Sequence, residues 1–266
     1  MVARSLEQRL VDSIHGGQCV RATKLEFRLR FVIMVVIVGL GFWSPWIEAW
    51  SVGQRIALLE WLALELSRAG LLPFTLAAPA VIAVASLAAL CGAVLRVSGT
   101  AYLGAQTMLD GQMHGDRVVA GGPYRFVRNP LYLGTLFMMA AMGFAMPPTG
   151  AVFTLVLEGL FLVRLILAEE AHLTEQMGET YQAYVRAVPR LLPRLRTSVE
   201  ASGEEPHWMR AVLHELAPIG VFIALSCFSW TYNNETILRA ILVSFGASLV
   251  VRALVKESKV GQAAAQ

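Results

Sequence analysis

Four stretches of this sequence carry no charged side chain, and their lengths constrain the fold more than any other feature. They run over 31–47, 69–95, 129–157 and 216–234. A helix needs about 20 apolar residues to cross the hydrocarbon core of a bilayer. The chain as a whole is 56% hydrophobic and only 15% charged, whereas soluble domains average about 25% charged residues. These figures exclude a soluble enzyme, a disordered chain and a disulfide-built secreted module.

Each apolar run is predicted to be a helix, because backbone groups inside lipid must satisfy one another and the runs lack the alternation of a membrane barrel. The expected fold class is all-α, a polytopic transmembrane helix bundle of about six helices. Pro147 and Pro148 are expected to turn the short third helix directly into the fourth, which makes these two a tight hairpin. The spanning helices are predicted at 31–50, 71–95, 131–146, 149–168, 211–230 and 236–255.

Lys and Arg residues gather in alternate connections, and this pattern predicts the orientation. They precede the first predicted helix, follow the second, the fourth and the sixth, and are sparse in the other connections. Because such residues are retained on the cytoplasmic side, both termini are expected in the cytoplasm, in a bacterial inner membrane. The net charge of +3 then reflects contact with lipid headgroups rather than nucleic-acid binding. No feature identifies a protein partner.

The predicted helices divide the chain into four parts. A cytoplasmic segment at 1–30 precedes two membrane helices at 31–95, with an interfacial helix between them. A core with polar clusters follows at 96–196 and includes the membrane hairpin 131–168. A linker and an appended two-helix hairpin occupy 197–266. No chemistry is expected in this last hairpin, and its His214 and Glu215 are interpreted as solvated at the level of the lipid headgroups.

Polar residues cluster in two places within the core. The first cluster, at 96–132, is rich in glycine and ends in Tyr124, Arg125, Arg128 and Asn129, just before a membrane helix. The second opens with Glu169, Glu170 and His172 where the fourth helix leaves the bilayer. Adjacent carboxylates on a helix point about 100° apart, so we expect one to address a site and the other to be solvated.

The segment after the second cluster is predicted to be an amphipathic helix that returns over the protein or membrane surface. Its apolar residues recur at spacings of three and four, which places them on one face. They are Leu173, Met177, Tyr181, Tyr184 and Val188. Because a tight hairpin joins the two clusters, they are expected to lie close together at one membrane face.

Five segments of the core resemble a known superfamily. They are Leu95-Arg96, Leu103-Gly104, GGPYRFVRNPLYLG at 121–134, EEAHL at 169–173 and GETYQAYVRAVPRLLP at 178–193. In this order and spacing they are similar to the isoprenylcysteine carboxyl methyltransferase and phospholipid methyltransferase superfamily. The resemblance implies an integral-membrane enzyme that moves a methyl group from S-adenosylmethionine to a hydrophobic or membrane-embedded acceptor. The core at 96–196 would then be the catalytic methyltransferase part, on the cytoplasmic side.

The resemblance also implies roles for individual residues. Glu170 would contact cationic or hydroxyl groups of the cofactor, Arg128 or Arg125 would pair with its carboxylate, and tyrosine rings would flank its adenine or sulfonium. Arg164 would orient the acceptor, unless it extends to the lipid headgroups instead. The expected cofactor-binding residues are Tyr124, Arg125, Arg128, Asn129, Pro130, Tyr132, Gly134, Glu169, Glu170 and Tyr184, and the expected catalytic residues are Arg164 and Glu170. The three scattered cysteines predict no metal site.

Two features depart from the family pattern or leave alternatives open. Asn129 stands where an R-H-P motif has histidine, and an amide cannot act as a general base. This favours an ionised carboxylate as acceptor over an amine or a thiol, for which a glutamate or His172 would have to serve as base. Glu158, near the middle of the fourth helix, is either a polar lining of the acceptor's path or a protonated, hydrogen-bonded packing residue.

Two other functions remain open for the chain. One is a membrane NADPH-dependent reductase of the sterol type, which shares an R-H-P-x-Y segment but usually lacks the glutamate pair and the Y-x-x-Y helix. The other is a non-catalytic lipid-binding membrane protein that has kept the fold.

Overall fold

The computed structural model describes residues 21–43, 56–103, 120–194, 196–197, 199–200, 203, 205–231 and 233–263, and all regular structure in these ranges is helical. The all-α prediction is therefore confirmed. The helices are α2 (Lys24–Arg28), α3 (Arg30–Phe42), α4 (Leu58–Arg68), α5 (Phe74–Leu103), α7 (Pro130–Gly143), α8 (Pro148–Met177), α9 (Glu179–Ala187), α10 (Trp208–His214), α11 (Leu216–Phe228) and α12 (Asn234–Ala263), with short 3-10 turns η2 (Gly122–Arg125) and η3 (Ser229–Thr231).

All six predicted membrane segments contain an apolar helix, but their lengths differ. Helices α5 and α8 and the segment Glu235–Leu254 of α12 are long and apolar enough to cross a bilayer. The pair α10 and α11 with η3 would make a fourth span that bends by 67°. Helices α3 and α7 are shorter. The short length of α7 was predicted, because the third segment has only sixteen residues. The first segment was expected to reach residue 50; its helix α3 ends at Phe42, and residues 44–50 lie outside those described.

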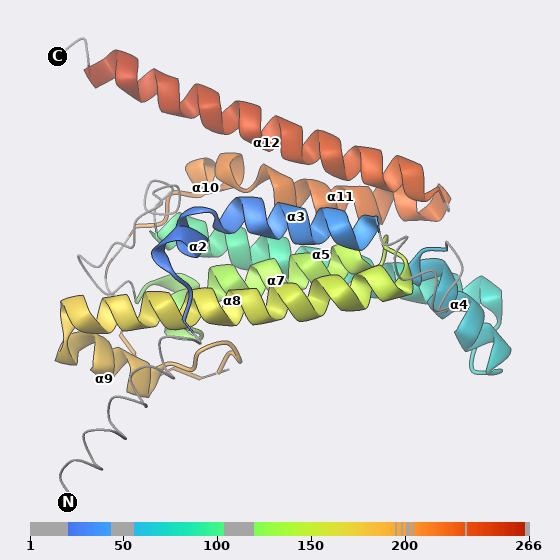
Figure 1. Cartoon of the computed structure of the whole chain (residues 1–266), viewed down its shortest axis with the longest axis horizontal. Coiled ribbons are helices and arrows are strands. Elements are labelled where there is room, and N and C mark those ends of the chain that lie inside the picture. The colour runs from blue at the N-terminus through green and yellow to red at the C-terminus, as the bar shows by residue number, and fades with distance from the viewer. Residues whose placement is uncertain are drawn as a thin grey trace, which may run out of the picture.

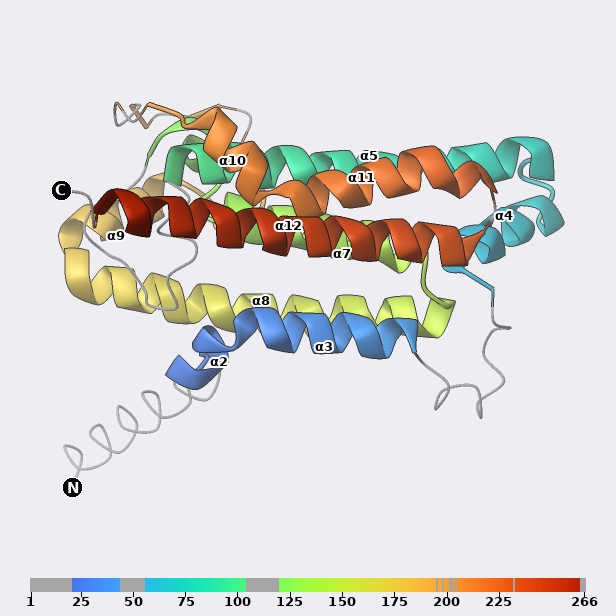
Figure 2. The ribbon, with the colours of Figure 1, turned by 90° about the horizontal axis from the view of Figure 1, so that it is seen from above.

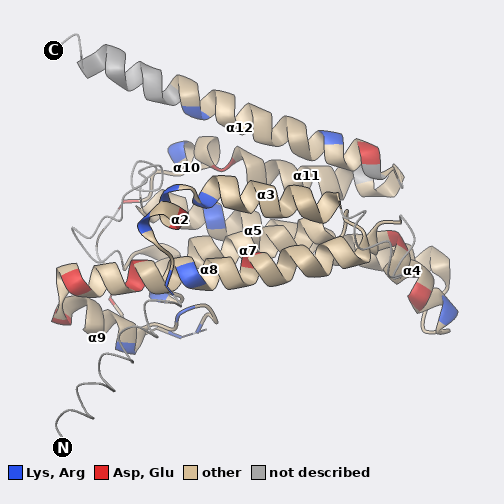
Figure 3. Cartoon of the chain, viewed as in Figure 1, with Lys and Arg blue, Asp and Glu red and all other residues tan. Residues whose placement is uncertain are grey.

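The long helices run lengthwise beside one another (Figures 1 and 2). Helix α7 packs between α5 and α8, α3 lies along α8, and α11 lies between α5 and α12. The short helices α2, α9 and α10 lie toward one end of this bundle and α4 toward the other. Charged side chains gather toward these two ends, whereas the central lengths are mostly uncharged (Figure 3). This distribution is that of a protein whose middle lies in lipid.

Glycines allow α5 and α7 to approach closely. A Cβ atom on Gly92 would lie 2.9 Å from the carbonyl oxygen of Gly134, and a Cβ on Gly134 would lie 3.0 Å from that of Gly92. About two turns further along α5, a Cβ on Gly99 would lie 2.8 Å from a methyl group of Leu131. Small residues are enriched at membrane helix interfaces because they allow this approach. The contact fixes α7, which begins at the first polar cluster, against α5.

The hairpin of α7 and α8 turns at residues 144–147, directly before Pro148, as predicted. The N–H of Leu58 donates to the carbonyl oxygen of Met146 at 2.7 Å, and that of Leu59 donates to Phe144 at 3.0 Å. These bonds fasten the first turn of α4 to the hairpin turn. Helix α4, predicted as an interfacial helix at 54–66, therefore closes this end of the bundle through backbone contacts as well as through its apolar face.

The last two long helices share the main hydrophobic core. Val221 and Leu225 of α11 and Ile241 of α12 are buried together with Met138 and Met142 of α7. Part of this cluster also packs against α3 and α5. The hairpin is thus joined to the preceding helices by apolar burial along much of its length.

Candidate functional site

The first polar cluster forms a tight turn at the end of α5. Gly122 has a φ of +51°, a conformation that glycine adopts without steric cost. A Cβ on Gly122 would also collide with the ring of Tyr102, in the last turn of α5. Pro123 is the second residue of η2, and Pro130 is the first residue of α7, where its missing N–H leaves no helical bond unmade. Gly122, Pro123 and Pro130 therefore shape a compact corner, with Tyr124 and Asn129 on either side of it.

Glu170 is the centre of the buried polar contacts at this corner. Its side chain accepts from Asn129 Nδ2 at 3.1 Å and from Arg190 Nη2 and Nε at 2.7 and 3.0 Å. Arg128 Nε lies 3.3 Å from the other side of the carboxylate, within ion-pair distance but without a hydrogen bond. Glu170 is 8% exposed. It thus joins α8, the residue that precedes α7 and the segment after α9, and its charge is matched by two arginines.

Glu169 faces a different element from Glu170, as its position on the helix requires. Tyr132 of α7 donates its hydroxyl to Glu169 Oε2 at 2.8 Å. The expectation that one of the two carboxylates is simply solvated is wrong, because both accept bonds from separate parts of the corner. The cation of Arg30, at the start of α3, also acts electrostatically on Glu169 and Tyr132.

Helix α9 folds back over the corner, and its predicted apolar face is confirmed. Tyr181, Tyr184 and Val188 are buried in one cluster with Leu173 and Met177 packed against it. The two halves of this face belong to separate helices, because Gly178, with a φ of +55°, ends α8 and begins a new direction. The chain therefore turns at a glycine and brings α9 against η2.

Hydrogen bonds to backbone carbonyls hold α9 and the segment after it in place. Tyr184 donates its hydroxyl to the carbonyl oxygen of Tyr124 at 2.7 Å. Arg128 Nη1 donates to the carbonyl of Val185 at 3.2 Å, and Arg125 Nε donates to that of Val199 at 2.9 Å. Three of the predicted cofactor-binding residues thus have at least one structural contact at this corner.

The hydroxyl of Tyr124 is buried and makes no hydrogen bond within the described part of the chain. Burial raises the pKa of this hydroxyl well above its ordinary value, and the nearby charge of Glu169 raises it further. A buried polar group without a partner costs free energy, so such a group marks a place where a ligand can supply the missing bond. This hydroxyl lies within electrostatic reach of Glu169 and of Arg96.

Two of the predicted site residues contact parts of the fold outside the corner. Arg164 donates from Nη2 to both carboxylate oxygens of Glu26 in α2, at 2.9 and 3.0 Å. Its side chain is 31% exposed, and it ties the N-terminal helix to α8. Gly134 lies at the crossing with α5, where the side chain of Arg96 covers it. The close approach of the helices is a sufficient reason for this glycine.

Sequence reasoning missed two arginines near the glutamates. Arg190 is the principal partner of Glu170, and the only sequence signal was its place after the V-P pair of the family pattern. Arg30 was counted only as a topological charge, but it is 9% exposed and lies over the Phe27 ring at 4.5 Å. Its Nη1 donates to the carbonyl oxygen of Phe27 at 2.9 Å, and its guanidinium also lies 4.8 Å from the centroid of the Phe31 ring.

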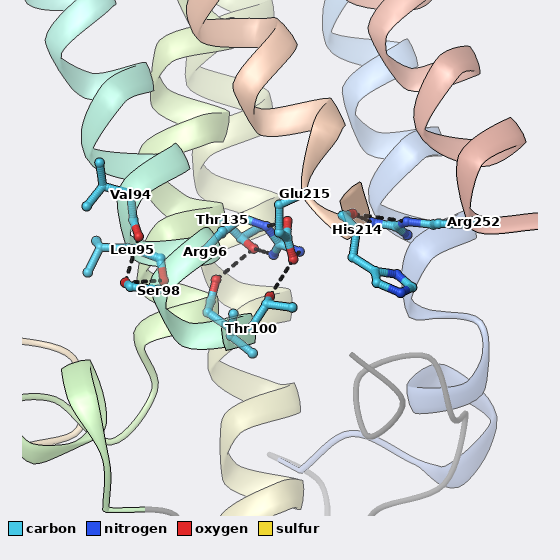
Figure 4. A network of polar contacts seen from close by, with 10 residues as sticks. Val94, Leu95, Arg96, Ser98, Thr100, Thr135, His214, Glu215 and Arg252 are labelled. Carbon is cyan, nitrogen blue, oxygen red and sulfur yellow. Dashed lines mark hydrogen bonds and ion pairs between the residues drawn. The ribbon is translucent and has the colours of Figure 1, made fainter. Parts of the chain in front are cut away.

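The interpretation of His214 and Glu215 as solvated is also wrong. His214 is 8% exposed, and Glu215 is fully buried. Arg96 Nε donates to Glu215 Oε2 at 2.7 Å and Nη2 donates to Oε1 at 3.0 Å (Figure 4). A charge at the end of a membrane helix usually reaches water or headgroups, but here the break between α10 and α11 turns Glu215 inward onto α5.

One family model matches part of the chain. Residues 80–180 match the model of a family described as phospholipid methyltransferase. This stretch contains most of α5, the corner, α7, α8 and the start of α9. The match confirms the superfamily resemblance and implies a membrane methyltransferase. No curated protein and no solved structure matched the chain.

Proposed function

Because residues 80–180 carry the phospholipid methyltransferase pattern, we propose that this protein transfers a methyl group from S-adenosylmethionine to a hydrophobic or membrane-embedded acceptor. The proposed site is the corner formed by η2, the first turns of α7, the end of α8, and α9. The observation that carries the proposal is the convergence of three predicted segments at this corner, through Tyr132–Glu169, Asn129–Glu170 and Tyr184–Tyr124.

The side chains present fit the polar groups of S-adenosylmethionine. Its amino group and ribose hydroxyls are donors, for which the remaining acceptor capacity of Glu169 and Glu170 is suited. Its carboxylate suits guanidinium groups, and Arg128, Arg125 and Arg190 supply these. The unpaired hydroxyl of Tyr124 is available to donate or accept. We assign Tyr124, Tyr132 and Glu169 to the reacting end of the cofactor, and the arginines, with Asn129 and Glu170, to its carboxylate end.

Pro130, Gly134 and Tyr184 enter this proposal as residues that hold the binding segment. Pro130 starts α7, Gly134 lets α7 rest on α5, and Tyr184 fixes the backbone at Tyr124. They would contribute to affinity by holding the tyrosine and glutamate side chains in position rather than by touching the cofactor. Orientation of reacting groups can account for several kcal/mol of a barrier, about 7 to 11 in well-oriented intramolecular reactions.

The cofactor supplies an electrophilic methyl group: a lone pair of the acceptor forms the new bond to carbon while the carbon–sulfur electron pair stays with sulfur. The chain therefore has to orient the acceptor and needs little proton transfer. Asn129 uses its amide N–H groups on Glu170 and on the carbonyl of Arg190, which is a holding role. With no base at this position, an ionised carboxylate remains the favoured acceptor over an amine or a thiol.

The acceptor is proposed to arrive from the bilayer, at the cytoplasmic end of the helices. The charged end that includes α2 and α9 would face the cytoplasm (Figure 3), in keeping with the arginine-rich connections. Arg30 and Arg164 are candidates for orienting an anionic acceptor. The Arg30 cation acts electrostatically on Glu169, whereas Arg164 pairs with Glu26.

Titration calorimetry of the purified protein with S-adenosylhomocysteine tests the cofactor. We expect saturable binding, no binding of NADPH, and a loss of at least about tenfold in Glu170→Gln, which corresponds to about 1.4 kcal/mol. Glu175→Gln is the matched control, because Glu175 is exposed on the same helix. Binding of NADPH without binding of S-adenosylhomocysteine would favour a reductase, and binding of neither would favour a non-catalytic lipid-binding protein.

Radiolabelled methyl transfer identifies the acceptor class. The label is offered with a total lipid extract and with panels of prenylcysteines, amines and thiols, in the presence of the protein. We expect base-labile methyl esters, because the site holds no titratable group at Asn129. Label in a quaternary amine or a thioether would contradict the preference for a carboxylate.

A further inference from the structure

The hairpin of α10, α11 and α12 lies outside the matched stretch 80–180, but it contacts the residues on which the corner rests. The N–H of His207 donates to the carbonyl of Ala101, at the end of α5, at 3.0 Å. The indole of Trp208 packs edge-on against the ring of Tyr102, with centroids 6.2 Å apart. Tyr102 is the ring that fills the space beside Gly122, at the start of η2. The first turn of α10 thus supports the turn that carries Tyr124.

A second connection starts at the break between α10 and α11. Glu215 is fully buried and accepts from Nε and Nη2 of Arg96, along one edge of the guanidinium. Thr100 also donates its hydroxyl to Glu215 Oε1, at 2.8 Å. Arg96 uses its remaining nitrogen, Nη1, to donate to Thr135 Oγ1 at 2.7 Å. Figure 4 shows Arg96 between Glu215 on one side and Thr135 on the other. The carboxylate from the hairpin therefore fixes an arginine whose far end lies on α7.

The break itself is stabilised from α12. Arg252 donates from Nη2 and Nε to the carbonyl oxygen of His214 at 2.6 and 3.2 Å. A carbonyl at the C-terminal end of a helix has no partner within that helix and is favoured by a cation. All three helices of the hairpin thus contribute to the position of the Glu215 carboxylate.

Arg96 in turn lies where it can affect the site. A Cβ on Gly134 would lie 2.7 Å from Arg96 Cγ, so the arginine stem crosses α7 at Gly134. Thr135 is one turn along α7 from Tyr132, which donates to Glu169. The charges of Arg96 and Glu215 also act on the Tyr124 hydroxyl.

We propose that Glu215 is a positioning residue of the methyl-transfer site: through Arg96 it sets the first turns of α7 and the surroundings of the Tyr124 hydroxyl. The hairpin is then a required part of the site rather than an appendage. This inference rests on the proposed function, because the site it positions is the one assigned to S-adenosylmethionine.

The test separates positioning from stability by removing one charge or both. Glu215→Gln leaves the Arg96 cation buried with a neutral partner, which destabilises the protein. Arg96→Met combined with Glu215→Met removes both charges, and apolar replacement of a buried pair is often neutral or stabilising. Glu235→Gln is the control, since Glu235 forms an exposed pair with Arg239 on the same hairpin. Melting temperature and affinity for S-adenosylhomocysteine are measured for each.

We expect Glu215→Gln to lower both quantities, with affinity falling about tenfold or more, because small displacements of a binding group cost this much. The double variant should regain the melting temperature of the unsubstituted protein but not its affinity. Recovery of both in the double variant would mean that the pair serves stability alone and would overturn the inference. So would an affinity in Glu215→Gln within twofold of that of the Glu235→Gln control.

A readout without cofactor distinguishes failure of this inference from failure of the proposed function. Tyrosines are replaced by 3-fluorotyrosine, and the fluorine resonances of Tyr124, Tyr132 and Tyr181 are assigned with tyrosine-to-phenylalanine variants. Glu215→Gln and the double variant should shift the first two resonances and leave that of Tyr181, buried in the α9 cluster, in place. If the unsubstituted protein does not bind S-adenosylhomocysteine, the proposed function fails. Unmoved Tyr124 and Tyr132 resonances would overturn the positioning role independently.

Discussion

Replacement of Gly134 by alanine separates two reasons for a glycine at this position. A Cβ atom there would lie 2.7 Å from Arg96 Cγ, 3.0 Å from the oxygen of Gly92 and 3.2 Å from the nitrogen of Arg96. Two of these three atoms are backbone and cannot yield. The third belongs to a side chain fixed at its far end by Glu215 and Thr135. The helices would have to move apart.

The expected magnitude follows from two opposing effects. Alanine in place of glycine inside a helix contributes about 0.5 to 1 kcal/mol, whereas overpacking costs about 1 to 3 kcal/mol. We expect Gly134→Ala to lower the free energy of unfolding by about 1 to 2 kcal/mol in total. Gly159→Ala is the matched control, because no atom lies within 4 Å of its Cβ position on α8. Gly159→Ala should therefore gain only the stability that alanine's higher helix propensity provides.

The assay is thermal unfolding of the detergent-solubilised protein together with binding of S-adenosylhomocysteine. One kcal/mol shifts the melting temperature of a chain of this size by about 2 to 4 °C, so a difference of about 1.5 to 3 kcal/mol should separate the melting temperatures of the two alanine variants by about 3 to 12 °C. If Gly134 is needed only so that cofactor can approach, Gly134→Ala would melt as high as Gly159→Ala and lose affinity alone. That result would refute the argument from the helix crossing.

Three further predictions follow from the site and the bundle. Tyr184→Phe should cost about 1 kcal/mol through loss of the bond to the Tyr124 carbonyl, seen as a lower melting temperature and weaker S-adenosylhomocysteine binding; an unchanged affinity would separate α9 from the site. Glu158→Met should raise the melting temperature, since a carboxyl at the centre of a membrane helix costs about 2.5 to 3.5 kcal/mol; a variant that instead keeps stability and cofactor affinity but loses methyl transfer would favour the acceptor path. Burial raises the pKa values of Tyr124, Tyr181 and Tyr184 above the ordinary value of about 10, so the folded state should lose stability as pH rises above about 10, and their phenolate absorbance should appear only with unfolding.

Glu158 shows how the structure limits one of two sequence interpretations. It is fully buried, and neither carboxylate oxygen has a hydrogen-bond partner within the described part of the chain. Glu158 is therefore a buried packing residue, as one interpretation had it, but it is not hydrogen-bonded within the described residues. Glu158 lies about three turns before Glu169 on α8, so a role in the acceptor's path would concern the tail of the acceptor rather than its reacting group.

The parts that the sequence predicted well depend on local patterns. Uninterrupted apolar runs predict spanning helices because backbone groups inside lipid must bond to one another. The Pro147–Pro148 pair predicts the hairpin because proline is tolerated at the first turn of a helix and disfavoured in its interior. The spacing from Leu173 to Val188 predicted which side chains are buried. It did not predict the turn at Gly178, because a three- and four-residue spacing persists when one helix follows another closely.

The partners of charged residues were not predictable from these patterns, and Glu215 gives the physical reason. Next to His214 at the end of an apolar run, it has the local signature of a solvated helix end, and nothing nearby in sequence offsets its charge. Its partner Arg96 is 119 residues earlier in the chain and has the signature of a cytoplasmic topology signal. Either residue alone would be costly to bury. When Arg96 and Glu215 pair with each other and also bond to Thr135 and Thr100, most of their polar atoms are satisfied. Burial of charge in this bundle is a property of pairs brought together by the fold, so the hairpin's link to the site emerges only when α10 and α5 are placed side by side.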